Sequence, residues 1–130
     1  MEACKDSGLA DFISEVSLDY VVGQNGAMLS GGQKQKIALA RALVHNSPVI
    51  IFDEATSNTD VYSEHQINGL LHTKLKEKTV IIITHKQEIL KEADQIIMLK
   101  DGVVVGSGVY DHLSKDNLEF KNMLKMGEKY

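Results

Sequence analysis

Two adjacent carboxylates, Asp53 and Glu54, directly follow the apolar run Val49–Phe52. Such a run predicts a strand, so the two acids would lie at the carboxyl edge of a sheet, where α/β folds bind ligands. One carboxylate there can hold Mg²⁺, and its neighbour can orient or deprotonate the water that attacks a terminal phosphate. Asp53 suits the metal role and Glu54 the water role. Acidic residues also favour helix N-termini through the helix dipole, so the pair alone leaves both interpretations open.

The segment Leu29–Gln33 reads Leu-Ser-Gly-Gly-Gln and combines a helix cap with two glycines. Ser30 is well suited to cap the helix that the pattern predicts from Gly31 to about Val44. A simple cap needs only Ser30, whereas glycine at 31 and 32 lowers helix stability by about 1 kcal/mol each. Because glycines let backbone N–H groups approach an anion at a helix N-terminus, Gly31 and Gly32 predict contact with phosphate.

These segments resemble the ATP-binding-cassette family in their order and spacing. The resemblance rests on LSGGQ at 29–33, KQKIALARAL at 34–43, VIIFDEATSNTD at 49–60 and IIITH at 81–85. It covers nearly the whole chain, and the sequence over 93–108 looks closest to exporter-type cassettes. The resemblance implies an α/β, partial P-loop NTPase-like fold, with ATP and Mg²⁺ as cofactors.

The resemblance also implies roles for individual residues. Leu29–Gln33 match the family's signature loop, which completes the ATP site of a facing subunit. Asp53 matches the magnesium-linked aspartate, and Glu54 matches the catalytic glutamate. Asp60 matches the aspartate of the D-loop along the dimer interface, although Asn58 departs from the small apolar residue common in that loop.

His85 follows a second apolar run, residues 80–83, and resembles the family's switch histidine. Its imidazole can donate a hydrogen bond to the γ-phosphate and help hold the catalytic geometry. The other histidines match no family motif, and we interpret them as surface or packing residues. They are His45, His65, His72 and His112.

The sequence contains no G-x-x-x-x-G-K-[ST] segment to cradle the β- and γ-phosphates. The family's glutamine loop and adenine-stacking aromatic are also unmatched. We therefore expect the C-terminal portion of one ATPase domain, with 1–46 in its helical and signature subdomain and 47–130 in its catalytic core. We expect this chain alone to be largely inactive, with open apolar sheet surfaces that promote self-association.

The elements before residue 50 would position the signature loop. Apolar spacing predicts a helix over Glu2–Ile13 that is interrupted or ends around Gly8, followed by a loop over 20–29. The helix from Gly31 would pack on one side and end at Asn46-Ser47-Pro48. Its expected apolar stripe consists of Ile37, Ala40, Leu43 and Val44.

The later elements would form the sheet that carries the carboxylates. Runs 49–52 and 80–83 lack alternation, which predicts strands covered on both faces of a parallel sheet. Helices over 62–75 and 86–93 would alternate with them in an α/β architecture. Asp101-Gly102 between runs 95–99 and 103–105 predicts a hairpin that adds an antiparallel edge. A single helix is expected over 111–125.

Composition bounds the class of protein. The 130 residues, 43% of them hydrophobic, suit one domain, and the formal net charge of −4 disfavours a general nucleic-acid surface. One cysteine, Cys4, cannot form an intrachain disulfide, which fits a reducing compartment. No apolar run approaches the roughly 20 residues that cross a bilayer, so any membrane role would come through a partner.

The resemblance implies an exporter's ATPase domain at the cytoplasmic face of the cell membrane. Its partners would be a second ATPase domain, in a homo- or heterodimer, and transmembrane domains, with no nucleic acid. One alternative is the ATPase head of a chromosome-maintenance or DNA-repair protein, although no heptad segment or basic surface supports it. Another is a non-catalytic interaction module, against which the intact Glu54 and His85 argue.

Overall fold

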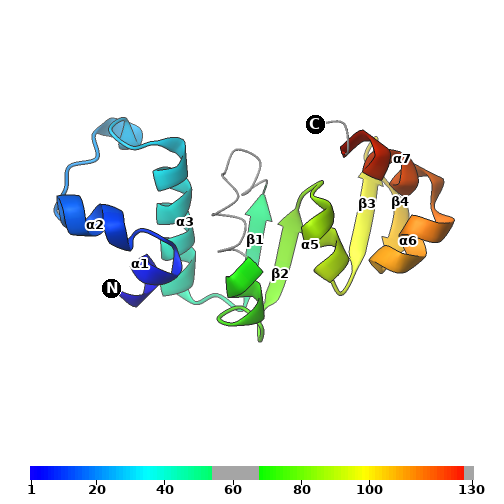
Figure 1. Cartoon of the computed structure of the whole chain (residues 1–130), viewed down its shortest axis with the longest axis horizontal. Helices are drawn as coiled ribbons and strands as arrows, with labels where there is room; N and C mark the ends of the chain where they lie inside the picture. The colour runs from blue at the N-terminus through cyan, green and yellow to red at the C-terminus, as the bar shows by residue number, and fades with distance from the viewer. Residues whose placement is uncertain (54–67, 128–130) are drawn as a thin grey trace. The chain divides into compact units, whose positions relative to one another are not determined.

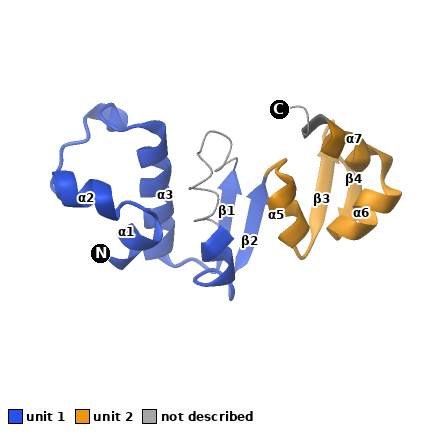
Figure 2. Cartoon of the chain, viewed as in Figure 1, with its two compact units in different colours: residues 1–83 blue, residues 84–130 orange. Residues whose placement is uncertain are grey.

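The structure, a computed structural model, describes residues 1–53 and 68–127. The chain forms two compact units, residues 1–83 and residues 84–130, which are coloured separately in Figure 2. From residue 31 to residue 100 the described helices alternate with strands, as predicted for an α/β fold (Figure 1). Within the described ranges, no helix is both long and apolar enough to cross a membrane.

The first unit begins with two short helices, α1 (Glu2–Asp6) and α2 (Ala10–Val16). Gly8 adopts a left-handed φ of 69° between them, which is the conformation that glycine tolerates best. Ser7 is fully buried, and its hydroxyl donates a hydrogen bond to the carbonyl of Cys4 (3.3 Å). The predicted interruption of the helix around Gly8 is therefore confirmed.

Helix α3 (Gly31–His45) starts and stops where the sequence predicts. Asn46 closes it in the left-handed conformation, with a φ of 54°, which is a common way for helices to end. The Lys78 ammonium then donates to Asn46 Oδ1 (2.8 Å) and to the Ser47 carbonyl (2.6 Å). A cation near the last carbonyls of a helix also interacts favourably with its dipole.

Strands β1 (Val49–Asp53) and β2 (Thr79–Ile83) form a parallel pair in register from Val49↔Thr79 to Asp53↔Ile83. The connection between them is helical over residues 68–72 and then turns. The expectation that this helix continues to residue 75 is therefore wrong. The Thr73 hydroxyl donates a hydrogen bond to the Gly69 carbonyl (2.7 Å), and the Thr73 N–H donates one to the Leu70 carbonyl (3.2 Å). These two bonds replace the regular helical pattern and end the helix.

One face of the β1–β2 pair is buried. Ile50 and Phe52 pack with Leu70 and Leu75, and helix α3 contributes Leu39 and Leu43 to the same cluster. Leu39 lies one turn before Leu43 and packs against the same cluster, although the predicted apolar stripe did not include it. Val44 from that stripe is 75% exposed, since the residue after Leu43 points about 100° around the helix.

The other face of the pair is open. Its large apolar side chains are 47–62% exposed, so the prediction of strands covered on both faces is wrong for this chain. The same exposure agrees with the expectation of open apolar sheet surfaces. The alternating burial of β1 shows that only one side of it is packed within the described residues. The exposed apolar residues are Val49, Ile51, Ile81 and Ile83.

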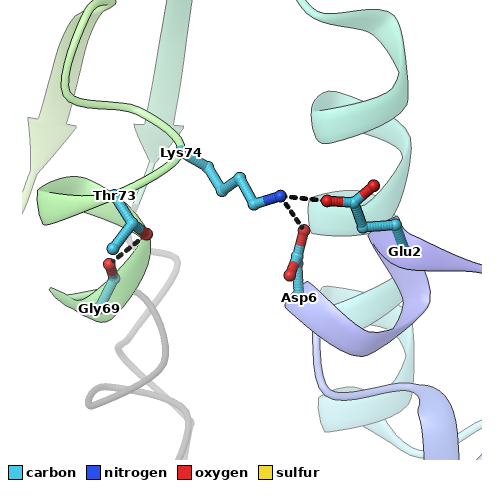
Figure 3. A network of polar contacts seen from close by, with 5 residues as sticks. All are labelled: Glu2, Asp6, Gly69, Thr73 and Lys74. Atoms are coloured by element: carbon cyan, nitrogen blue, oxygen red, sulfur yellow. Dashed lines mark hydrogen bonds and ion pairs between the residues drawn. The ribbon is translucent and has the colours of Figure 1, made fainter.

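A polar contact ties α1 to the turn before β2. The Lys74 ammonium bonds to Glu2 Oε1 and lies 3.5 Å from Asp6 Oδ2, so it bridges two carboxylates of one helix (Figure 3). The hydrogen bond with Lys74 lowers the pKa of Glu2 and raises that of Lys74. Lys74 and Glu2 are exposed to solvent and Asp6 is partly exposed, so the contribution of the bridge to stability is small and depends on salt.

The second unit contains α5 (Gln87–Glu92) and the antiparallel strands β3 (Ile96–Lys100) and β4 (Val103–Gly108). Asp101 and Gly102 both have positive φ, 50° and 78°, as a two-residue hairpin turn of type I′ requires. The hairpin is confirmed, but its addition to the parallel pair is wrong. Among the described strands, β3 and β4 pair only with each other.

Two helices complete the second unit, α6 (Tyr110–Asp116) and α7 (Leu118–Gly127). The prediction of one helix over 111–125 is wrong because Asn117 leaves helical geometry, with φ −101° and ψ 116°. Its Oδ1 accepts a hydrogen bond from the Phe120 N–H (2.9 Å) and so caps α7. The buried core of this unit consists of Leu90, Ile96, Leu113 and Phe120.

Candidate functional site

Helix α3 begins with a complete capping box. Ser30 Oγ accepts a hydrogen bond from the Gln33 N–H (3.1 Å), and Gln33 Oε1 accepts one from the Ser30 N–H (2.8 Å). This reciprocal pair fixes the first turn of the helix. The hydroxyl of Ser30 accepts a hydrogen bond in the cap, so its own hydrogen can still be donated to a ligand.

The backbone at Gly31 and Gly32 is open. A Cβ atom built on either glycine would meet no atom within 4 Å, so packing in this chain does not require glycine there. Both residues precede the first intrahelical bond, from Lys34 N to Ser30 O (3.0 Å). The first turn also contains no acidic residue. The helix start therefore presents uncovered N–H groups and a positive dipole end to an anion.

The loop before Ser30 is shaped by positive-φ residues. Gly23, Asn25 and Gly26 have φ values of 74°, 53° and 67°. A Cβ on Gly26 would lie 3.3 Å from Lys34 Cε and 3.4 Å from Leu29 Cδ1, so both side chains pack over this glycine. Half-buried Leu29 thus anchors the approach to the exposed Ser30.

Asp53 is exposed at the carboxyl end of β1, opposite Ile83 of β2. An exposed carboxylate in this place is free to bind a cation, as the sequence analysis requires of a magnesium ligand. In the described part of the chain, no three His, Cys, Asp or Glu side chains cluster as a metal site. The predicted residues Glu54 and Asp60 lie outside the described residues, so Asp53 is the visible part of the acidic segment.

His85 is exposed and follows Ile83 of β2 by two residues. Thr84, the residue between the strand and His85, makes a specific contact. Its Oγ1 accepts a hydrogen bond from the Lys86 N–H (3.1 Å), so a hydroxyl closes the turn that contains His85. Threonine before a polar residue is too common for the sequence alone to predict this contact.

The structure brings some of the predicted residues together and leaves others apart. Ser30 and Gln33 bond to each other, and their glycine neighbours form the same helix start. Asp53 belongs to a different element, the end of β1. Within 1–53, no hydrogen bond joins the Leu29–Gln33 segment to Asp53. The two predicted parts of the site therefore belong to different elements of the first unit, α3 and β1.

Comparisons with known proteins point to one family. The family model described as ABC transporter matches residues 4–57. The ATP-dependent lipid A-core flippase of Escherichia coli (strain K12) is 40% identical over 127 residues, which are 96% of this chain and 22% of that protein. The protein of the same description from Shigella flexneri matches with the same figures.

The fold gives the same result. A solved structure of a bacterial Atm1-family ABC exporter with ATP bound matches with a TM-score of 0.87 and 35% sequence identity. The match covers 97% of this chain and 22% of that one. In sequence and in fold, the chain is therefore similar to the nucleotide-binding domain of exporter-type ABC transporters. The chain spans about a fifth of the length of the curated relatives it matches.

Proposed function

We propose that this chain contributes the signature loop and part of the catalytic segment to an ATPase domain that powers export across a membrane. The main observation in support of this proposal is the start of α3, where a capping box fixes the first turn and the backbone of Gly31 and Gly32 is open. Two glycines at this place do not improve the packing or the stability of the helix. They do allow a phosphate to approach the backbone N–H groups. The ABC transporter match at 4–57 includes this segment.

The other predicted residues would act on the same nucleotide. Bound MgATP would supply the phosphoryl group and the metal that neutralises its charge. Asp53 would hold Mg²⁺, Glu54 would orient or deprotonate water, and His85 would donate a hydrogen bond to the γ-phosphate. The exposure of Asp53 and His85 supports this proposal, because each side chain is accessible to a ligand.

The proposed assembly is a head-to-tail dimer of ATPase domains at the cytoplasmic face of the membrane. Residues 1–46 would belong to the helical and signature subdomain and 47–130 to the catalytic core. Leu29–Gln33 would complete the partner domain's ATP site, while Asp60 would lie along the interface. The proposal is supported by the placement of the signature segment and Asp53 on different elements, with no hydrogen bond between them in the described residues. Closure of the two domains would drive the transmembrane partners.

The chain alone is proposed to be largely inactive. Without a phosphate cradle, most contacts to ATP are missing, so affinity for the nucleotide would be weak. Isothermal titration calorimetry with MgATP tests this by comparing the 130-residue chain with one extended upstream through a P-loop. We expect binding only by the extended chain. Tight binding by the short chain would contradict the proposal, because it would require a phosphate site within these 130 residues.

Variants of the extended chain test the residue roles. Asp53→Asn should weaken Mg²⁺-dependent binding of ATP, whereas Asp94→Asn removes an exposed carboxylate elsewhere and should leave it unchanged. Glu54→Gln should preserve binding and abolish turnover, because it removes only the group assigned to water. Turnover that survives Glu54→Gln would refute the proposed catalytic role.

A further inference from the structure

The turn that contains His85 is held by the hydroxyl of the preceding residue. Thr84 Oγ1 accepts the hydrogen bond from the Lys86 N–H (3.1 Å), so the bond spans His85. Thr84 is half-buried, whereas His85 between the two bonded residues is exposed. The Thr84 hydroxyl therefore constrains the backbone at His85, whose imidazole is accessible to solvent and ligands.

The far side of this turn is anchored in the core of the second unit. The carbonyl of Lys86 accepts a hydrogen bond from the Leu90 N–H (3.2 Å), and Leu90 is buried next to buried Ile89. Lys86 is thus fixed through its carbonyl by α5 and through its N–H by Thr84. The bond to Thr84 is made by a side chain of the turn itself, so it can be removed by substitution without changing α5.

The first residue of α5 strengthens this anchor. Gln87 Oε1 accepts a hydrogen bond from the Tyr110 hydroxyl (3.4 Å), and Gln87 Nε2 donates one to the Leu124 carbonyl (3.4 Å). Tyr110 also packs edge to face on Phe120, with ring centroids 5.6 Å apart. These contacts join the start of α5 to α6 and α7, so α5 holds the adjoining His85 turn in place.

We propose that Thr84 is a positioning residue for His85. A hydrogen-bond donor stabilises a developing charge only when its backbone holds it within a fraction of an ångström of the productive place. Through Lys86, the Thr84 hydroxyl ties the His85 turn to α5. This inference rests on the proposed function, in which His85 donates to the γ-phosphate of ATP.

Two substitutions distinguish the effect of the Thr84 hydroxyl from the effect of the side chain's shape. Thr84→Val keeps the branched side chain and removes the acceptor, while Thr84→Ser keeps the acceptor and removes the methyl group. Steady-state hydrolysis of MgATP is measured on the complete transporter that contains this chain. We expect Thr84→Val to lower kcat about tenfold with KM within about twofold, and Thr84→Ser to stay within about twofold of the original.

A double substitution shows whether the effect passes through His85. Thr84→Val should cause no further loss of kcat in a His85→Ala background, because residues that act as a unit are not additive. The proposal is overturned if Thr84→Val leaves kcat unchanged, if Thr84→Ser loses as much as Thr84→Val, or if Thr84→Val lowers kcat equally without His85. Should Thr84→Val fail to fold, Thr84→Ala against Thr84→Ser makes the same comparison.

Failure of the positioning role is distinct from failure of the ATPase proposal. If Glu54→Gln retains full turnover, the assigned catalytic chemistry is wrong. If Glu54→Gln abolishes turnover but His85→Ala leaves it intact, the ATPase proposal stands, and Thr84 has no functional side chain to position. The second result overturns the inference on Thr84 alone.

Discussion

Asn117 and Gly106 are in such close contact that a side chain on the glycine would not fit. A Cβ on Gly106 would lie 2.7 Å from Asn117 Nδ2, closer than real Cβ atoms approach other heavy atoms. The same amide nitrogen donates a hydrogen bond to the Val105 carbonyl (2.9 Å), while the amide oxygen caps α7 through Phe120 N. One side chain thus joins strand β4 to the break between α6 and α7.

Gly106→Ala should therefore destabilise the chain by about 1–3 kcal/mol, because the added methyl group forces Asn117 away from its partners. Urea denaturation followed by circular dichroism gives the free energy of unfolding. Gly69→Ala is the matched control, since a Cβ there meets nothing within 4 Å. Residue 69 lies in a helix, so the control should be neutral or slightly stabilising. Equal effects of the two substitutions would contradict the close contact.

This contact also shows where sequence reasoning stops. The positions of α3, β1, β2 and the β3–β4 hairpin followed from local signals, such as Ser30 as a cap and Asp101-Gly102 as a turn. The break at Asn117 was missed, although asparagine is a common helix cap and its bond to the Phe120 N–H is local. Its second bond, to the Val105 carbonyl twelve residues away, has no local signal. Likewise, the helix before β2 ends early because Thr73 bonds to Gly69, a choice that residue spacing does not reveal.

The candidate site likewise has features that the sequence predicted and features that it did not. Residue types and spacing predicted the open glycines, and the structure places them at a helix start as expected. They did not predict that Gln33 would close the capping box or that Thr84 would bridge His85, since both contacts depend on side-chain geometry. Burial of the strands was predicted on both faces because β-branched runs look the same whether or not a neighbour covers them.

Gly31→Ala and Gly32→Ala should change stability and activity in opposite directions. Each should stabilise α3 by up to about 1 kcal/mol, because alanine has the higher helix propensity and its methyl group enters open space. Each should lower the ATPase rate of the complete transporter by blocking the approach of phosphate to the backbone. Denaturation and hydrolysis assays on the same proteins test both signs. Full activity with raised stability would rule out a phosphate role for these glycines.

Ser30 should show two separable roles. Ser30→Ala removes the cap and should lower the free energy of unfolding by about 1 kcal/mol. Ser30→Asp retains a capping oxygen and should leave stability near the original, but its negative charge should repel phosphate and lower ATP hydrolysis. Urea denaturation and steady-state hydrolysis measure the two effects. If Ser30→Asp hydrolyses ATP normally, the hydroxyl has only a structural role.

The bridge from Lys74 to Glu2 and Asp6 should give a small pH-dependent contribution to stability. The pKa of Glu2 is lowered by the hydrogen bond from Lys74, so its contribution is present above the ordinary pKa of glutamate and is lost as pH falls through the lowered value. The pKa of Lys74 is raised by the same bond, so its contribution is present below the ordinary pKa of lysine and is lost as pH rises through the raised value.

Lys74→Met should therefore flatten both flanks of the stability profile, and the difference from the original should shrink in high salt because these charges are exposed. Thermal unfolding between acid and alkaline pH, in low and high salt, measures the profile. Lys76→Met removes an exposed lysine two residues further along and controls for the change in net charge. A profile altered equally by both variants would assign the effect to net charge, because Lys74, and not Lys76, forms the described bridge from the turn to α1.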